Sequence, residues 1–255
     1  MFINLKQLNL SAALLFGLVF TTPLFAQSSV DEPLESHPYQ FTTLDLIGKS
    51  SPQLTKGKDY RVLPEVAVAL EKMKADAKAA GFDICVISSY RNYAYQNGIW
   101  ERKYKANATK GIKGIKNIEK IIEYSTIPGT SRHHWGTDID IIDMTKGIPL
   151  DPLHEKHFNP GGQMHKFKLW LDENANKYGF YLVYTHDKNR KGFKYEPWHF
   201  TYKPISDRMM EEYKKLDLKK LLQENKLMGS ENFTEEFIGK YRSENILDIN
   251  TQLNK

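Results

Sequence analysis

Two histidines stand in polar segments whose residue types suit the binding of a metal ion. His133 is followed by Gly136, which permits a turn, and then by an alternating run that predicts a strand. On that strand Asp138 and Asp140 project from the same face, because side chains alternate along a strand. A carboxylate from this face could meet the imidazole of His133. His199, on another predicted strand, could complete a set of three ligands.

The combination of two imidazoles and one carboxylate is typical of catalytic zinc. Such a set leaves a fourth position open for water, whereas structural zinc is closed by four protein ligands. Glu196 precedes His199 by three residues and could accept the proton of that water. These residue types predict metal-assisted hydrolysis.

The elements that must position these residues mix helices and strands. A helix is predicted over 64–80, because Pro64 suits a first helical turn, apolar residues recur on one face and Gly81 follows. Apolar and alternating runs predict strands, and helical spacings predict further helices. The predicted strands are 82–89, 137–144, 180–184 and 194–202, and the further helices are 92–106 and 167–178. This pattern predicts an α+β core.

The first 26 residues have the pattern of a secretory signal. A short segment with one cation, Lys6, leads into the apolar run Leu10–Phe20, which is too short to cross a bilayer comfortably. We expect a cut after Ala26, although Leu24 is larger than the usual residue at its position. The alternative is an uncleaved membrane anchor. The signal predicts an exported protein, periplasmic or secreted, with no stable membrane anchor after cleavage.

Composition narrows the classes of function. The chain carries 36 Lys and Arg against 31 Asp and Glu, a net charge of +5 over 255 residues, which argues against a strongly electrostatic nucleic-acid binder. Cys85 is the only cysteine in the sequence, so no intramolecular disulfide can form.

The five lysines from Lys103 to Lys116 predict a solvated loop. Alternatively, this segment borders a cleft for an anionic polymer.

Three motifs stand in a fixed order along the chain. They are Ser89-Tyr90-Arg91 with Gln96, then Ser131-x-His133-x-x-Gly136-x-x-x-Asp140, and then Glu196-x-x-His199. In this order they closely resemble the VanY-like zinc D-alanyl-D-alanine carboxypeptidases, a group related to lysostaphin-type peptidases and hedgehog domains. Three ordered motifs are specific in a way that a single motif is not. The resemblance covers about residues 64–204.

The resemblance implies a metal centre and a fold to carry it. It implies that His133, Asp140 and His199 bind one Zn²⁺ ion and that Glu196 is the general base. The implied fold is a single α+β domain in which a small antiparallel sheet bears the zinc site and helices flank the sheet. We therefore expect a zinc metallopeptidase.

The resemblance also implies how a substrate is held. Arg91 and Ser131 are expected to bind the terminal carboxylate of the substrate, which a guanidinium can hold with two parallel hydrogen bonds. Gln96 is a weaker candidate on the substrate side. The implied reaction is removal of a terminal D-alanine from peptidoglycan stem peptides. The alternatives are a peptidoglycan endopeptidase, a D,D-dipeptidase of the same chemistry, and a non-catalytic cell-wall-binding module.

These inferences divide the chain into four segments. From Ser206 onward, charged sequence with apolar residues at helical spacings predicts additional helices. The segments are a signal peptide at 1–26, an N-terminal leader at 27–59, a VanY-like metallopeptidase domain at 60–204 and a C-terminal helical extension at 205–255.

Some residues near the motifs have open roles. Asp138 departs from the family pattern, since many relatives have a small residue there. Its carboxylate could orient a ligand histidine, pair with Arg91 or Arg132, or contact an ammonium group of the substrate. His134 is interpreted as a packing residue behind the site or, alternatively, as an oxyanion stabiliser. In the run His154–His157 the histidines are three apart between prolines, which predicts a loop and not a helical zinc motif.

Overall fold

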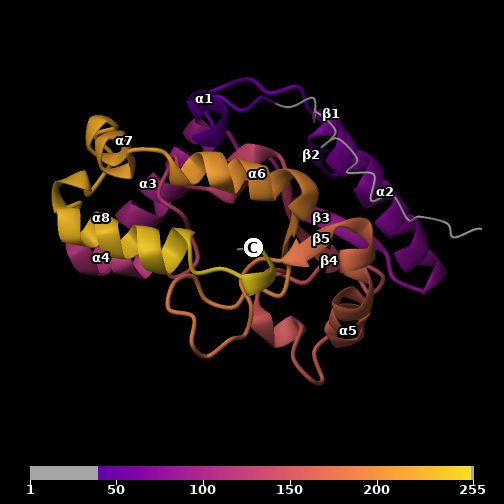
Figure 1. The fold of residues 1–255 in the computed structure, drawn as a ribbon. Helices are drawn as coiled ribbons and strands as arrows, with labels where there is room; N and C mark the ends of the chain where they lie inside the picture. Colours follow the sequence, from indigo (N-terminus) through magenta and orange to yellow (C-terminus); the bar gives the residue numbers. More distant parts are fainter. Residues whose placement is uncertain (1–39, 254–255) are drawn as a thin grey trace, which may run out of the picture. The chain divides into compact units, whose positions relative to one another are not determined.

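The computed structural model describes residues 40–253. The signal peptide predicted at 1–26 and residues 27–39 of the predicted leader lie outside this range. Within the range, no helix is both long enough and apolar enough to cross a membrane. From residue 40 onward the chain forms one unit, whose elements are shown in Figure 1.

The centre of the fold is an antiparallel sheet of four strands in the order β3-β4-β6-β5. Its strands are β3 (Ile84–Ser88), β4 (Asp138–Asp143), β5 (Phe180–Leu182) and β6 (His199–Tyr202), and a separate hairpin pairs β1 (Thr55–Lys56) with β2 (Arg61–Val62). The α+β prediction is confirmed. The strand predicted at 194–202 forms only in its last four residues, because a turn joins the backbone oxygen of Glu196 to the N–H of His199 (3.1 Å).

The register of the sheet brings predicted ligands to one face. Asp140 pairs with His199, and Asp138 pairs with Thr201. Directly opposed residues of antiparallel strands project to the same side, and so do residues two apart along one strand. The sheet therefore presents Asp140 and His199 next to each other, with Asp138 and Thr201 adjacent to them.

Helices flank this sheet (Figure 1). α2 begins at Pro64 and ends before Gly81, whose φ of 89° suits glycine, as the sequence predicts. It packs through buried side chains that include Leu70 and Met73. The helices are α1 (Thr43–Leu46), α2 (Pro64–Ala79), α3 (Tyr93–Thr109), α4 (Ile115–Ile121), α5 (His165–Asn174), α6 (Lys203–Lys214), α7 (Leu218–Glu224) and α8 (Glu235–Tyr241).

The lysine-rich segment is helical at both ends, so the prediction of a solvated loop is confirmed only for residues 110–114. α3 runs through its first part, and α4 begins near its end. The buried amide of Asn117 donates to the backbone oxygen of Tyr104 and accepts from Asn107, both at 2.9 Å, and Ile118 is fully buried. The five lysines are exposed: Lys103 and Lys105 lie on α3, Lys116 lies on α4, and Lys110 and Lys113 lie in the loop between the helices. Asn117 and Ile118 therefore anchor α4 to α3, although the lysine-rich composition of this segment alone predicts an exposed loop.

The C-terminal helices contact the loop that leads into the predicted metal site. Tyr213 of α6 donates to the backbone oxygen of Gly129 (2.9 Å). The hydroxyl of Tyr241 in α8 accepts from the backbone N–H of Ile127 (3.1 Å) and lies 2.8 Å from the hydroxyl of Thr130. Both tyrosines are buried. α6 and α8 therefore hold this loop in place.

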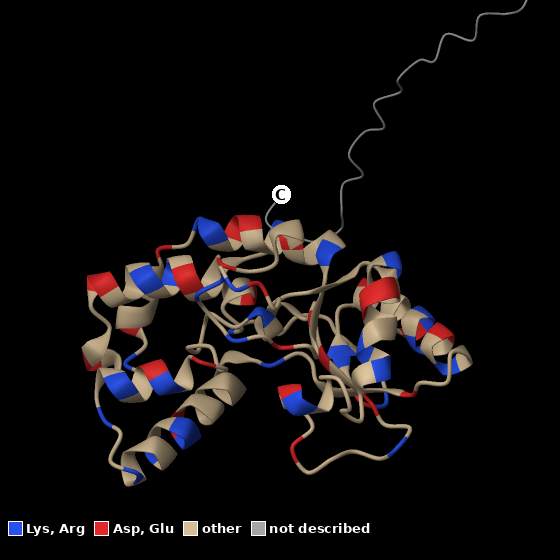
Figure 2. Cartoon of the chain, turned by 90° about the horizontal axis from the view of Figure 1, so that it is seen from below, with Lys and Arg blue, Asp and Glu red and all other residues tan. Residues whose placement is uncertain are grey.

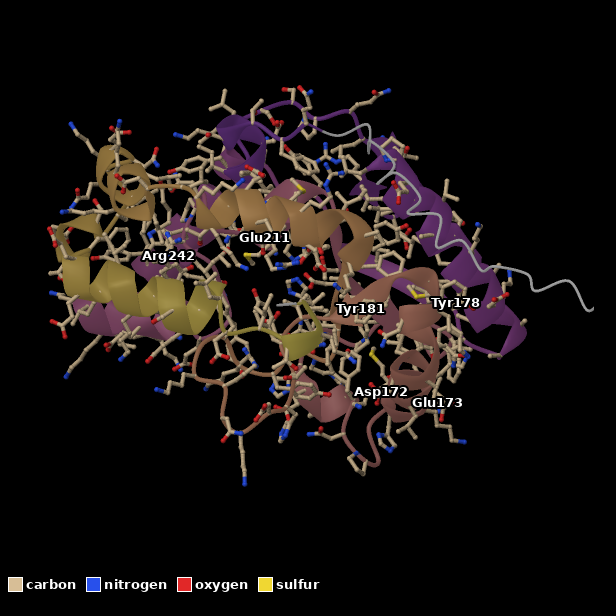
Figure 3. All side chains as sticks on the ribbon, in the orientation of Figure 1. Asp172, Glu173, Tyr178, Tyr181, Glu211 and Arg242 are labelled. Atoms are coloured by element: carbon tan, nitrogen blue, oxygen red, sulfur yellow. The ribbon has the colours of Figure 1, made fainter. Side chains whose placement is uncertain are left out.

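Charged groups connect the C-terminal helices to one another. Arg242, labelled in Figure 3, follows α8. It donates to the backbone oxygen of Lys214, the last residue of α6, and to that of Leu216, the latter at 3.3 Å. Figure 2 shows Lys and Arg interspersed with Asp and Glu along the helices of the chain. The domain boundary between residues 204 and 205 stays a prediction.

We expect Tyr241→Phe to lower the free energy of unfolding by about 1–3 kcal/mol, because the buried N–H of Ile127 loses its acceptor. Urea unfolding measures this change. Tyr95→Phe is the matched control, since the side chain of Tyr95 is 61% exposed. Equal losses of stability in both variants would contradict the proposed role of the Tyr241 hydroxyl.

Candidate metal centre

Three of the predicted residues bring potential ligand atoms together. One such atom each from His133, Asp140 and His199 lies within 4.8 Å of the other two, and all three residues are buried. Asp140 comes from β4, His199 from β6, and His133 from the short 3-10 helix Arg132–Trp135. Within residues 40–253 this is the one group of histidine, cysteine and acidic side chains that could hold a metal ion.

Gly136 turns the chain from the 3-10 helix into β4. Its φ of 69° lies in the left-handed region, and a Cβ at this position would come within 3.1 Å of Leu54 Cδ2. Both the backbone conformation and the available space therefore favour glycine. This turn allows His133 to approach Asp140, which follows it by seven residues.

Each imidazole has one ring nitrogen in a hydrogen bond away from Asp140 and the other near Asp140; in His199 this second nitrogen, Nδ1, also lies 3.0 Å from Glu196 Oε2. His133 Nδ1 lies 2.8 Å from the backbone oxygen of Ser89, and its Nε2 lies 3.4 Å from Asp140 Oδ2. His199 Nε2 lies 2.9 Å from Asp138 Oδ2, and its Nδ1 lies 3.6 Å from Asp140 Oδ1. Within the described range, His133 Nε2 and Asp140 Oδ1 are buried without a hydrogen-bond partner. Because such buried atoms are rare, their presence here fits the binding of a cation.

The charges in this group depend on one another. Burial alone would raise the pKa of Asp140, but the neighbouring imidazole of His133 outweighs it and the pKa is lowered. Burial would lower the pKa of His199, but hydrogen bonds with Asp138 and Glu196 raise it to about 10. An imidazolium must lose its proton before it can bind a cation. Metal binding here is therefore coupled to proton release.

Glu196 lies beside the three potential ligands. Its side chain is buried, and its Oε2 lies 3.0 Å from His199 Nδ1. Burial raises the pKa of Glu196, against the lowering effect of His199. A carboxylate whose pKa is shifted toward neutrality is suited to accept a proton and to return it.

A cavity of about 430 Å³ opens next to these groups. Arg91 and Ser131 line it together with the three potential ligands and Glu196. Arg91 Nε and Ser131 Oγ are buried and have no hydrogen-bond partner in the described part of the chain. They are therefore available to bind an anionic group of a ligand.

Gln96 lies behind Arg91, and the cavity lining does not include it. It is fully buried. Its Oε1 accepts from Arg91 Nη1 (3.1 Å), and its Nε2 donates to the backbone oxygen of Thr126 (2.9 Å). The amide thus fixes the guanidinium, and any effect of Gln96 on a ligand passes through Arg91.

The cavity lining also includes residues outside the three motifs, among them Tyr184 and Lys103. Tyr184 is buried and packs edge-on against His199, with ring centroids 5.0 Å apart. Lys103 of α3 lines the cavity and donates to Ser125 Oγ (2.6 Å). No local pattern marks Tyr184. Lys103 belongs to the lysine-rich segment, for which a position beside a cleft is the alternative prediction.

The other histidines near the motifs have structural contacts. His134 is buried, with Nδ1 2.6 Å from the backbone oxygen of Arg91 and Nε2 accepting from the N–H of Gly129 (3.2 Å). Burial lowers the pKa of His134 to about 3. His134 thus remains neutral and joins two loops, as a packing residue does. His154 and His157 lie around a 3-10 turn with ring centroids 6.4 Å apart, and not on a helix.

Known proteins resemble this chain in sequence. A putative carboxypeptidase, YodJ, of Bacillus subtilis (strain 168) is 31% identical over 139 residues, which cover 54% of this chain and 45% of the relative. A D-alanyl-D-alanine carboxypeptidase of Enterococcus faecalis (strain ATCC 700802 / V583) is 29% identical over 153 residues, covering 59% of this chain and 50% of the relative. The matched region spans about half the length of these curated relatives.

Structural and family comparisons agree with the sequence matches. The structure of VanYB in complex with D-alanine-D-alanine superposes with a TM-score of 0.51 at 24% identity, over 70% of this chain and 92% of that one, and so shows a shared fold. Residues 59–205, more than half of the chain, match the family VanY, described as D-alanyl-D-alanine carboxypeptidase. The chain therefore belongs to the VanY family of D-alanyl-D-alanine carboxypeptidases.

Proposed function

We propose that the protein is an exported, zinc-dependent carboxypeptidase that removes a terminal D-alanine from peptidoglycan stem peptides. The observation that carries this proposal is the convergence of His133, Asp140 and His199 beside Glu196, at a cavity that Arg91 also lines. Membership in the VanY family supports the same reaction class. One matched relative is named a D-alanyl-D-alanine carboxypeptidase, which supports a terminal D-alanine as the residue removed.

The three potential ligands fit zinc. Two imidazole nitrogens and one carboxylate are borderline and hard donors that zinc accepts, and three protein ligands are usual where zinc is catalytic. Among the described residues, His133 Nε2 and Asp140 Oδ1 are buried and have no hydrogen-bond partner. Their lone pairs are therefore free to bind a cation. His133, Asp140 and His199 would hold the zinc ion, which would supply a Lewis acid for the attacking water and the scissile carbonyl.

Glu196 handles the proton in this proposal. Its carboxylate takes a proton from the attacking water and later gives a proton to the leaving amine. Burial raises the pKa of Glu196, which strengthens it as a base and also lets it act as an acid in the second half of the reaction. Its position 3.0 Å from His199 Nδ1 keeps it next to the metal position.

Arg91 and Ser131 select the bond to be cut. Arg91 Nε and Ser131 Oγ, which have no partner within residues 40–253, can donate to the terminal carboxylate of a peptide. Fixing that carboxylate places the last peptide bond at the reacting groups. Gln96 holds the guanidinium from behind through its Oε1. This arrangement favours removal of a terminal residue over cutting inside a chain.

We expect Arg91→Ala to lower kcat/KM by about 10- to 100-fold for a peptide with a free terminal D-alanine, because a charged hydrogen bond contributes about 1.5–3 kcal/mol. The measurement compares this peptide with its C-terminal amide. The wild-type enzyme should prefer the free acid, and the variant should lose that preference. Arg102→Ala on the exposed side of α3 is the control. A variant that still discriminates between acid and amide would refute the role of Arg91.

Products from defined muropeptides distinguish the proposed reaction from its alternatives. Mass spectrometry before and after incubation, with and without a chelator, reports the bond that is cut and its dependence on metal. Release of a single D-alanine supports the carboxypeptidase. Release of a dipeptide or cleavage of cross-links supports a D,D-dipeptidase or an endopeptidase. Absence of any chelator-sensitive cleavage supports a non-catalytic wall-binding module.

Localisation and domain boundaries are part of the same proposal. A cell-wall substrate requires export to the periplasm or beyond, which the signal predicted at 1–26 would provide. We place the metallopeptidase domain at 60–204, between the leader at 27–59 and the helical extension at 205–255. N-terminal sequencing of the exported protein tests the cut after Ala26.

A further inference from the structure

The carboxylate of Asp138 is fully occupied by protein groups behind His199. Its Oδ2 accepts hydrogen bonds from Arg132 Nε and from His199 Nε2, both at 2.9 Å. Its Oδ1 accepts from the hydroxyls of Thr137 (2.8 Å) and Thr201 (2.6 Å). Asp138 is 0% exposed, and the cavity lining does not include it. A substrate ammonium group therefore has no access to this carboxylate.

The surroundings of Asp138 hold it rigidly. The register of β4 and β6 sets it opposite Thr201 and diagonal to His199. Arg132 donates a further hydrogen bond from Nη2 to Thr201 Oγ1 (2.9 Å), and its guanidinium lies 4.6 Å from the ring centroid of Trp135. The positive charge of Arg132 offsets the buried negative charge of Asp138, which keeps the pair tolerable in the interior.

We propose that Asp138 is a positioning residue for the metal centre: it keeps the proton of the neutral His199 ring on Nε2 and directs Nδ1 toward the carboxylates of Asp140 and Glu196. The inference rests on the proposed function, because it requires that His199 bind the metal. A neutral imidazole carries one proton, so an N–H at Nε2 leaves the lone pair of Nδ1 for a cation. Acceptors behind ligating histidines are known to fix the tautomer and raise the basicity of the ligand.

The two histidines of the centre differ in this respect. The second nitrogen of His133 faces a neutral backbone oxygen, that of Ser89. The second nitrogen of His199 faces a full carboxylate that is itself held by three other donors. In this proposal, His199 is therefore the ligand whose orientation and basicity depend on a charged side chain.

Zinc affinity of Asp138→Asn tests the inference. The side-chain amide carries no negative charge, and while its oxygen faces Arg132 and His199 its NH2 group cannot accept from the hydroxyls of Thr137 and Thr201. We therefore expect the dissociation constant for zinc to rise about 10- to 100-fold. Competition with a chromophoric chelator measures this dissociation constant.

The matched control is Asp143→Asn. Asp143 is a buried aspartate at the other end of β4, and its Oδ1 accepts from the backbone N–H groups of Asp83 (2.9 Å) and Thr145 (3.0 Å). Its zinc affinity should equal that of the wild type.

A second variant and a second readout cover the case in which Asp138→Asn does not fold. Thr201→Val removes one donor to Asp138 and keeps every charge, and we expect zinc binding about 2- to 10-fold weaker. In the zinc-loaded wild type, long-range proton–nitrogen correlation spectra should show the His199 proton on Nε2.

The outcomes separate the two proposals. Wild-type zinc affinity in folded Asp138→Asn, an equal loss in Asp143→Asn, unchanged affinity in Thr201→Val, or a His199 proton on Nδ1 would overturn the role of Asp138 alone. Failure of the wild-type protein to bind zinc would instead overturn the proposed function.

Discussion

Glu196→Gln should lose turnover while it keeps its zinc. An amide cannot accept the proton of the attacking water, and removal of a general base costs about 10²–10⁴-fold in kcat. Glutamine has nearly the same shape, and the three potential ligands remain in place, so the zinc content should stay at one ion per chain. Steady-state kinetics on a muropeptide and elemental analysis of the same sample measure both quantities.

A matched substitution on the surface controls for the loss of one carboxylate. Glu173, labelled in Figure 3, is exposed on α5, and Glu173→Gln should leave kcat unchanged. The Glu196→Gln enzyme should also bind a substrate peptide as the wild type does, because Arg91 and Ser131 are untouched. Turnover within a factor of ten of the wild type in Glu196→Gln would remove Glu196 as the base.

His133→Ala should abolish activity by removing the metal. His133 is 2% exposed, and its Nε2 is unpartnered among the described residues, so no other side chain is poised to replace it as a ligand. Loss of a residue behind a ligand costs about 10- to 100-fold in affinity, and loss of the ligand itself should cost more than about 100-fold. Calorimetric titration of the metal-free protein with zinc measures the change.

His186→Ala is the control for this substitution, since the side chain of His186 is 77% exposed and it does not line the cavity. It should bind zinc as the wild type does. The thermal stability of metal-free His133→Ala separates lost ligation from lost folding. Zinc binding of wild-type strength in a folded His133→Ala variant would show that His133 is not a ligand.

Local rules predict the elements around the site. Pro64 at a first turn and Gly81 after the last turn delimit α2 without reference to the rest of the molecule. Alternation places Asp138 and Asp140 on one face of β4, and Gly136 supplies the left-handed turn before it. These features depend on residues that are neighbours in sequence, which is why a pattern can reveal them.

Contacts between distant segments are what the sequence leaves undetermined. Arg132 reaches Thr201 across 69 positions, and the sequence does not reveal that Asp138 pairs with Arg132 and not with Arg91. The hydroxyl of Tyr241 contacts that of Thr130, a residue 111 positions away in the sequence. The helical spacing of α8 therefore predicts that Tyr241 is buried but not which residue it contacts. Gln96 shows the same limit, because its motif position does not reveal that its amide faces Arg91.

The most direct test of the account is a crystal structure of the zinc-loaded protein with anomalous scattering data on both sides of the zinc absorption edge. The account predicts one zinc peak, about 2.0–2.2 Å from His133 Nε2, an Asp140 carboxylate oxygen and His199 Nδ1. The peak should be absent from crystals treated with a chelator. A zinc ion held by other residues, or no ion between these three side chains, would contradict the account.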